Sequence, residues 1–142
     1  MPRGDEAGRG TSPEEELSRL AVVLEPVAEI VEHYDDALTV GHAGTVASLR
    51  VVAIGDGLEL VSLTQILAWD LPLTDDTYRR VAAQTAATLL GTVTLVPKPG
   101  SEDQADVMLR YNFPGAGLSD DALRTLVLMV LDAGAEVRAA LG

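Results

Sequence analysis

The sequence LTDD occurs at residues 73–76, and the closely similar LSDD occurs at residues 118–121. Each phrase follows runs of strand-forming residues and precedes an apolar stretch with helical periodicity. Thr74 and Ser119 can accept hydrogen bonds from the unpaired backbone N–H groups at a helix start, and the aspartates after them face the positive end of the helix dipole. We therefore interpret these aspartates as helix-capping residues and not as catalytic ones. The chain from Thr45 onward is predicted to contain two rounds of strand, strand and helix.

The strands of both rounds form hairpins in this prediction. Gly55-Asp56-Gly57 joins the first pair and has the composition of a hairpin turn. A charged segment with two prolines, residues 97–103, joins the second pair and cannot continue a strand. The predicted strands are 45–54, 58–70, 92–96 and 105–113. The helices after them are predicted from Thr74 to about Leu90 and from Ser119 to about Leu141.

The N-terminal part begins with residues 1–11, a polar, glycine-rich segment that we predict to be a disordered tail. Ser12 then has the position of a helix cap, Pro13 that of the first helical residue, and Glu15 that of the capping-box partner. We expect a single domain over residues 12–142, because a chain of this length can bury one core without disulfides or a structural metal.

The first helix is predicted to continue beyond Pro26. Apolar residues recur at steps of three and four as far as Tyr34, although a proline inside a helix removes a backbone donor and crowds the preceding turn. We therefore expect a bend at Pro26 and not an end. With a short strand at 37–40 and a turn at 41–44, the predicted order is α-β(3)-α-β(2)-α, an α+β fold with helices on an antiparallel sheet.

The charge of the chain excludes several classes of partner. The 22 acidic residues against 10 Lys and Arg give a formal net charge of −12, so the average field repels nucleic acids and anionic lipid surfaces. No cysteine is present, which removes disulfides, thiolate nucleophiles and cysteine metal sites. No apolar run approaches the length that spans a bilayer. We therefore expect a cytoplasmic protein that binds neither nucleic acid nor membrane.

Candidate catalytic and metal-binding residues are few. His33, Asp35, Asp36 and His42 lie within ten residues of one another and offer nitrogen and oxygen ligands, but their spacing is irregular, and acids at a helix end followed by a turn are common. No serine has the glycine-flanked setting of a nucleophile elbow. We predict no catalytic, cofactor-binding or metal-binding residue, no cofactor and no enzymatic activity.

Apolar surface in excess of a single core is the main functional signal. Residues 126–131 are apolar on every side, and Leu128 and Leu131 lie on a flank of the helix that would need a second contact. The strand 58–70 carries apolar residues on both faces, with Trp69 near its end. Either the helices wrap both sides of the sheet or the first helix covers the extra surface, or else self-association or a protein partner covers it. We take Trp69, Leu128 and Leu131 as candidate partner-binding residues, although packing in the core is the simpler role for the single tryptophan.

A family resemblance rests on four stretches, namely the strand end Ile66–Pro72, the helix after it, the hairpin strand through Val107–Tyr111, and Gly117–Arg124 at the start of the last helix. These stretches resemble the YbjN-like family, whose fold is that of type III secretion chaperones. The resemblance covers roughly residues 45–141 and carries no catalytic signature. It implies an α+β domain, often dimeric, that is acidic, binds other proteins and is frequently described as regulatory.

The leading hypothesis is a non-enzymatic, acidic protein-binding module of the YbjN-like, chaperone-like or regulatory type. It would form a homodimer and bind a further, unidentified protein. The alternative is a small-molecule-sensing regulatory domain that uses a cavity between sheet and helices, with Trp69 and Tyr111 at the rim of that cavity.

Overall fold

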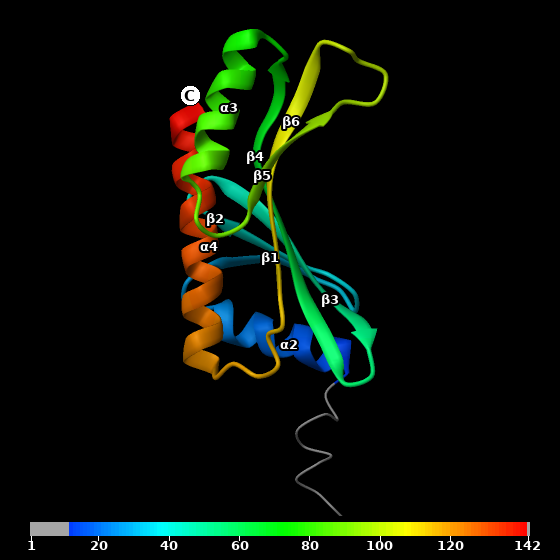
Figure 1. Cartoon of the computed structure of the whole chain (residues 1–142). Coiled ribbons are helices and arrows are strands. Elements are labelled where there is room, and N and C mark those ends of the chain that lie inside the picture. Colours follow the sequence, from blue (N-terminus) through cyan, green and yellow to red (C-terminus); the bar gives the residue numbers. More distant parts are fainter. Residues whose placement is uncertain (1–11, 142) are drawn as a thin grey trace, which may run out of the picture.

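The computed structural model describes residues 12–141, which form three helices and one antiparallel sheet of six strands (Figure 1). The elements are α2 (Pro13–Leu24), β1 (Glu29–His33), β2 (Leu38–His42), β3 (Thr45–Gly55), β4 (Leu58–Pro72), α3 (Asp75–Ala87), β5 (Thr92–Pro97), β6 (Gln104–Phe113) and α4 (Asp120–Leu141). The strand order in the sheet is β1-β2-β3-β4-β6-β5. The α+β class is confirmed, whereas the tail predicted for residues 1–11 lies outside the described residues.

The first helix is shorter than predicted. It ends at Leu24, and the backbone N–H groups of Val27 and Ala28 both bond to the Leu24 carbonyl in a turn. Pro26 lies in this turn, so the prediction of a bend with a continuing helix was wrong. The chain goes on as strand β1, in which Val31 is exposed, and four strands instead of three precede α3. The helical spacing of apolar residues beyond Pro26 did not correspond to a buried face.

The predicted helix starts are confirmed. Ser12, Thr74 and Ser119 each accept a hydrogen bond from the backbone N–H three residues later, at 3.1–3.2 Å. At Ser12 the capping box is complete, because the Glu15 carboxylate also accepts the Ser12 N–H at 2.9 Å. The end of α3 differs from the prediction. This helix stops at Ala87, and Leu89 lies beyond it, almost fully exposed.

All three helices lie on the same face of the sheet. Side chains alternate along β4, and those directed toward the helices are fully or nearly fully buried: Val61, Leu63, Gln65 and Leu67. In Figure 1, α4 runs along one side of the elongated molecule, with α3 beside its C-terminal half and α2 crossing near its N-terminal end. The helices therefore do not wrap both sides of the sheet, and the opposite face has no covering element among residues 12–141.

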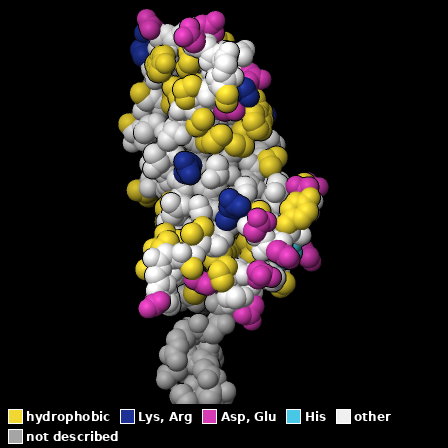
Figure 2. Space-filling model, turned by 90° about the vertical axis from the view of Figure 1, so that its right-hand side faces the viewer, with side chains coloured by type: hydrophobic (Ala, Val, Ile, Leu, Met, Phe, Trp, Pro, Cys, Tyr) yellow, Lys and Arg dark blue, Asp and Glu magenta, His cyan; other side chains and the backbone are white. Residues whose placement is uncertain are grey.

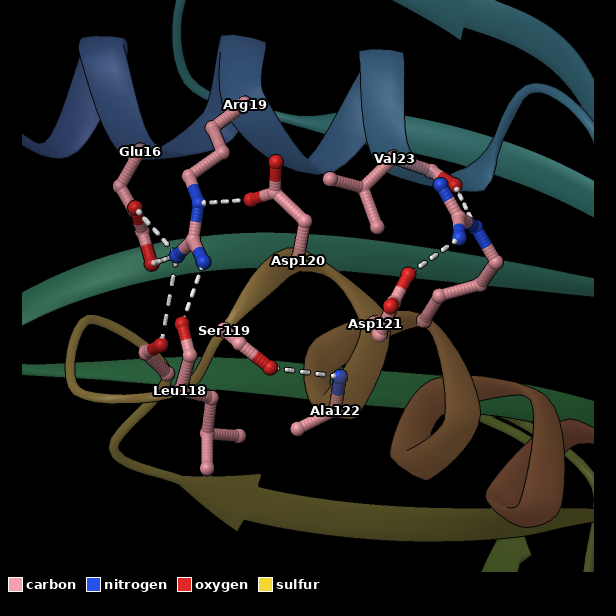
Figure 3. A network of polar contacts seen from close by, with 10 residues as sticks. Glu16, Arg19, Val23, Leu118, Ser119, Asp120, Asp121 and Ala122 are labelled. Atoms are coloured by element: carbon pink, nitrogen blue, oxygen red, sulfur yellow. Dashed lines mark hydrogen bonds and ion pairs between the residues drawn. The ribbon is translucent and has the colours of Figure 1, made fainter.

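A network of polar contacts ties α2 to the start of α4 (Figure 3). Arg19 donates to Asp120 at 2.9 Å, to the carboxylate of Glu16 at 3.2–3.3 Å, and to the backbone carbonyls of Gly115 and Leu118. Burial by itself lowers the pKa of Arg19, but the hydrogen bond to Asp120 and the charge of Glu16 raise it above its ordinary value. Glu16 is only 2% exposed, so this member of the acidic run at 14–16 is not a solvated residue.

Candidate functional site

Strand β4 extends beyond its neighbour β3. The last residue of β4 that pairs with β3 is Ile66, opposite Val46, because β3 begins at Thr45 and the chain turns away before it toward β2. From there to Pro72, the described residues pair with β4 only on its β6 side. Two register shifts fall within this stretch, and Asp70 has a positive φ of 54°. The strand therefore bends where it loses a neighbour.

A cavity of about 710 Å³ occupies the place that β3 leaves open. It lies between the bend of β4, the turn from β2 to β3 and the last turns of α4. The wall formed by α4 includes the small side chains of Ala135 and Ala139, which leave space beside the strand. Its lining residues are Ala43, Gly44, Val46, Ile66, Leu67, Ala68, Trp69, Leu71, Ala135, Arg138, Ala139 and Leu141. We call this space the bend cavity.

Arg138 is the single charged residue in the lining of the bend cavity. Its guanidinium lies against the turn between β2 and β3, since a β-carbon at Gly44 would be 2.9 Å from Arg138 Nη1. Gly44 has a φ of +79°, which suits a residue without a side chain. Among the described residues, no acidic side chain forms an ion pair with Arg138. The bend cavity thus combines apolar walls with one uncompensated positive charge.

Trp69 stands on the bent part of β4 with 62% of its surface exposed. Lys98 Nζ lies 5.5 Å from the centre of the indole ring, a distance that permits a cation–π contact. The same ammonium group pairs with Asp70 at 3.0 Å and with Asp106 at 3.4 Å. The hydrogen bond to Asp70, helped by the one to Asp106, raises the pKa of Lys98 above its ordinary value despite partial burial. Lys98 therefore lies beside Trp69 and between two carboxylates that compensate its charge.

A search of solved structures finds a match over nearly the whole chain. The crystal structure of YbjN from E. coli, described as a candidate transcription regulator, aligns with a TM-score of 0.58 over 86% of this chain and 87% of that chain, at 15% identity. This chain has a YbjN-like fold. No family model matches the sequence, and no curated protein matches it. At this identity the comparison with YbjN establishes the fold alone.

Within the YbjN-like fold, the three candidate partner-binding residues have different surroundings. Trp69 is exposed, Leu128 is partly buried, and Leu131 has no exposed surface. The expectation that Leu131 lies on an uncovered flank was wrong, because that side of α4 faces the sheet and the Leu131 carbonyl accepts a hydrogen bond from Gln65 of β4. Leu131 is a core residue of the YbjN-like domain.

Of the two residues expected at the rim of a ligand cavity, Trp69 and Tyr111, one lies at the bend cavity. Trp69 lines the bend cavity, but Tyr111 is partly buried in β6 and stacks against Phe113 with ring centroids 5.5 Å apart. Tyr111 is not among the residues that line the cavity. Arg138 does line the cavity, but it was not among the residues predicted from the sequence. A basic residue in the last turn of a helix is ordinarily explained by the helix dipole and gives no separate signal of a binding site.

The two histidines of the YbjN-like chain occupy separate strands. His33 ends β1, whereas His42 ends β2 and lies 2.6 Å from Asp132 of α4. Across residues 12–141, no group of three His, Asp or Glu side chains is placed to hold a metal ion. Nor does any helix in this part of the chain combine the length and the hydropathy needed to cross a membrane.

Proposed function

We propose that this YbjN-like chain is a non-enzymatic, acidic regulatory module that acts in the cytoplasm by binding protein, as a homodimer and toward a further protein partner. The observation that carries the proposal is the uncovered face of the sheet. An antiparallel sheet can leave one face in water, but such a face is then expected to be polar throughout. Here it retains large apolar side chains at both ends.

We define the bare face by the residues of β3 to β6 that point away from the helices. Their register follows from the strand pairing, in which Ser48, Thr64, Arg110 and Thr92 form one row across four strands. The apolar members include Val46, Val52, Ile54 and Leu58, which are 45–55% exposed. The set is Val46, Ser48, Arg50, Val52, Ile54, Leu58, Leu60, Ser62, Thr64, Ile66, Thr92, Thr94, Val96, Asp106, Met108, Arg110 and Asn112.

The charge of the bare face favours association between two copies. The chain as a whole carries −12, so two copies repel each other in most orientations. The bare face contains two arginines and one acidic residue, Asp106, whose carboxylate pairs with Lys98. Contact across the centre of this face therefore brings together surfaces that repel each other weakly. Viewed from the side opposite α4, hydrophobic side chains gather above and below a middle zone with two basic side chains, while acidic ones lie mainly at the margins (Figure 2).

A regulatory role through protein contacts is consistent with the structural neighbour. E. coli YbjN is described as a candidate transcription regulator. With a formal charge of −12 and two arginines on the bare face, this chain is poorly suited to neutralise a phosphate backbone. We therefore infer that any regulation proceeds through other proteins.

Sedimentation velocity at micromolar concentration tests the proposal. We expect a dimer for the wild-type chain and a shift to monomer for Val52→Asp, because a carboxylate would be placed among apolar side chains of the interface. Val22→Asp is the matched control, since Val22 is 72% exposed on α2 and belongs to the other side of the molecule. A monomeric wild-type chain, or a dimer that survives Val52→Asp but dissociates with Val22→Asp, would contradict the assignment to the bare face.

A further inference from the structure

We propose that the bend cavity is a binding site for a small anionic amphiphile, namely a single carboxylate on an aliphatic body. This inference stands beside the proposed protein-binding role and does not depend on it. The volume of about 710 Å³ lies within the range of about 300–1,000 Å³ that is common for small-molecule pockets.

The walls of the bend cavity select an apolar body. Nine of the twelve lining residues have purely hydrocarbon side chains. The other three are Trp69, which is apolar apart from its indole N–H, Gly44 and Arg138. Leu67 and Leu141 are the most buried of its lining residues, at 1% and 8% exposed. A strongly hydrated polyanion would lose its water against these walls without replacement, and this cost disfavours nucleotides and inorganic phosphate.

The head group is selected by Arg138. A guanidinium presents paired N–H donors that match the two oxygens of a carboxylate, and the exposed side chain of Arg138 is open to such a ligand. Because the described residues supply no acidic partner for Arg138, a bound carboxylate would displace no internal ion pair. One cation against one carboxylate leaves the occupied cavity neutral, whereas a second negative charge would remain uncompensated within a chain of net charge −12.

The strand edge adds polar groups at the same place. Beyond Ile66, β4 pairs only with β6 among the described residues, so alternate backbone N–H and C=O groups point away from its single neighbour. Such groups can hold the water molecules or the second oxygen of a carboxylate near Arg138. The bend of β4, the absence of β3 and the small residues of α4 together form a site that the pairing of a regular sheet would have closed.

Trp69 provides a direct measurement, because it is the single tryptophan of the chain and lines the cavity. The full chain is titrated with dodecanoate and dodecyltrimethylammonium below their micelle-forming concentrations, and with dodecanol below its solubility limit. Indole fluorescence is recorded, with calorimetry as a second readout. We expect saturable binding of one dodecanoate per chain, weaker binding of the alcohol and the weakest binding of the cation. Equal affinity for the three probes, or a change that never saturates, would overturn the proposal.

Two variants and one control locate the site. Arg138→Gln should weaken dodecanoate binding about tenfold, which corresponds to about 1.4 kcal/mol, and should leave dodecanol binding unchanged. Arg110→Gln on the bare face removes the same charge elsewhere and should change neither. Ala139→Leu, which suits a helix and fills the cavity, should weaken both probes. The proposal fails if Arg138→Gln binds dodecanoate as the wild type does, or if Ala139→Leu retains full affinity while its circular dichroism shows an intact fold.

Discussion

Gly134 of α4 faces the side chain of Gln65 on β4 in the centre of the core. A β-carbon at position 134 would come within 2.8 Å of Gln65 Nε2 and closer still to Oε1, so the glycine makes room for the buried amide. Gln65 is 0% exposed and donates to Thr45 Oγ1 at 2.8 Å and to the Leu131 carbonyl at 3.1 Å. This pair sets the distance between the longest helix and the longest strand.

Gly134→Ala is expected to destabilise the fold. Alanine favours a helix over glycine by about 1 kcal/mol, but the overlap with Gln65 costs about 1–3 kcal/mol, so the net loss should be up to about 2 kcal/mol. The free energy of unfolding is measured for both chains by urea titration. Gly55→Ala is the control, since a β-carbon there meets nothing within 4 Å. In a Gln65→Ala background the loss should disappear, and a loss that persists there would show that the amide is not the cause.

Leu131→Ala is expected to lower the free energy of unfolding by about 3 kcal/mol, because the side chain is fully buried and its removal leaves a cavity. Met129 lies two residues away on the same helix and is 51% exposed, so Met129→Ala should change the free energy of unfolding by less than about 0.5 kcal/mol. Thermal and urea unfolding of the two variants give the comparison. Similar small effects for both would mean that Leu131 is not a core residue.

Arg19→Gln should lower the free energy of unfolding by about 2 kcal/mol, since it leaves the buried carboxylate of Glu16 without its cation and two backbone carbonyls without a charged donor. Arg79→Gln is the matched control. Its pair with Asp76 is exposed on both sides, and such pairs contribute less than about 1 kcal/mol. Equal losses in the two variants would argue against a structural role for the network of Figure 3.

Glu59→Gln is expected to stabilise the fold at neutral pH. Burial, followed by the charges of Glu16 and Glu15, raises the pKa of Glu59 above its ordinary value of 4.5. The folded chain therefore binds this proton more tightly than the unfolded chain, so stability is lost as the pH rises through the interval between the two pKa values. The advantage of the variant should shrink as the pH falls toward 4.5.

Unfolding curves at several pH values test this sign for Glu59. Glu102→Gln, in the exposed turn between β5 and β6, is the control and should alter stability little at any of them. A variant at position 59 that is less stable than the wild type at neutral pH would contradict the prediction.

Local patterns were sufficient for much of the fold. The hydroxyl caps at Ser12, Thr74 and Ser119, the hairpin turn at 55–57 and the alternation along β4 act over a few residues, and each of these features appears in the structure. The same kind of reasoning failed at Pro26, where apolar residues at helical spacing belonged to a turn and to strand β1. The spacing predicted a helix, but Pro26 removes a backbone donor and residues 29–33 pair with β2, and these two effects outweighed the pattern.

The sequence by itself thus determined the capped helix starts, the α+β class and the acidic charge of this protein, because these depend on neighbouring residues or on composition. Only the tertiary structure decided that Leu131 is enclosed, that one sheet face is bare, and that Arg138 and Trp69 line the same cavity. Those features arise where segments far apart in the chain pack together. The point at which β3 begins beside β4, and the path of α4 past it, are set by long-range packing, which no local pattern encodes.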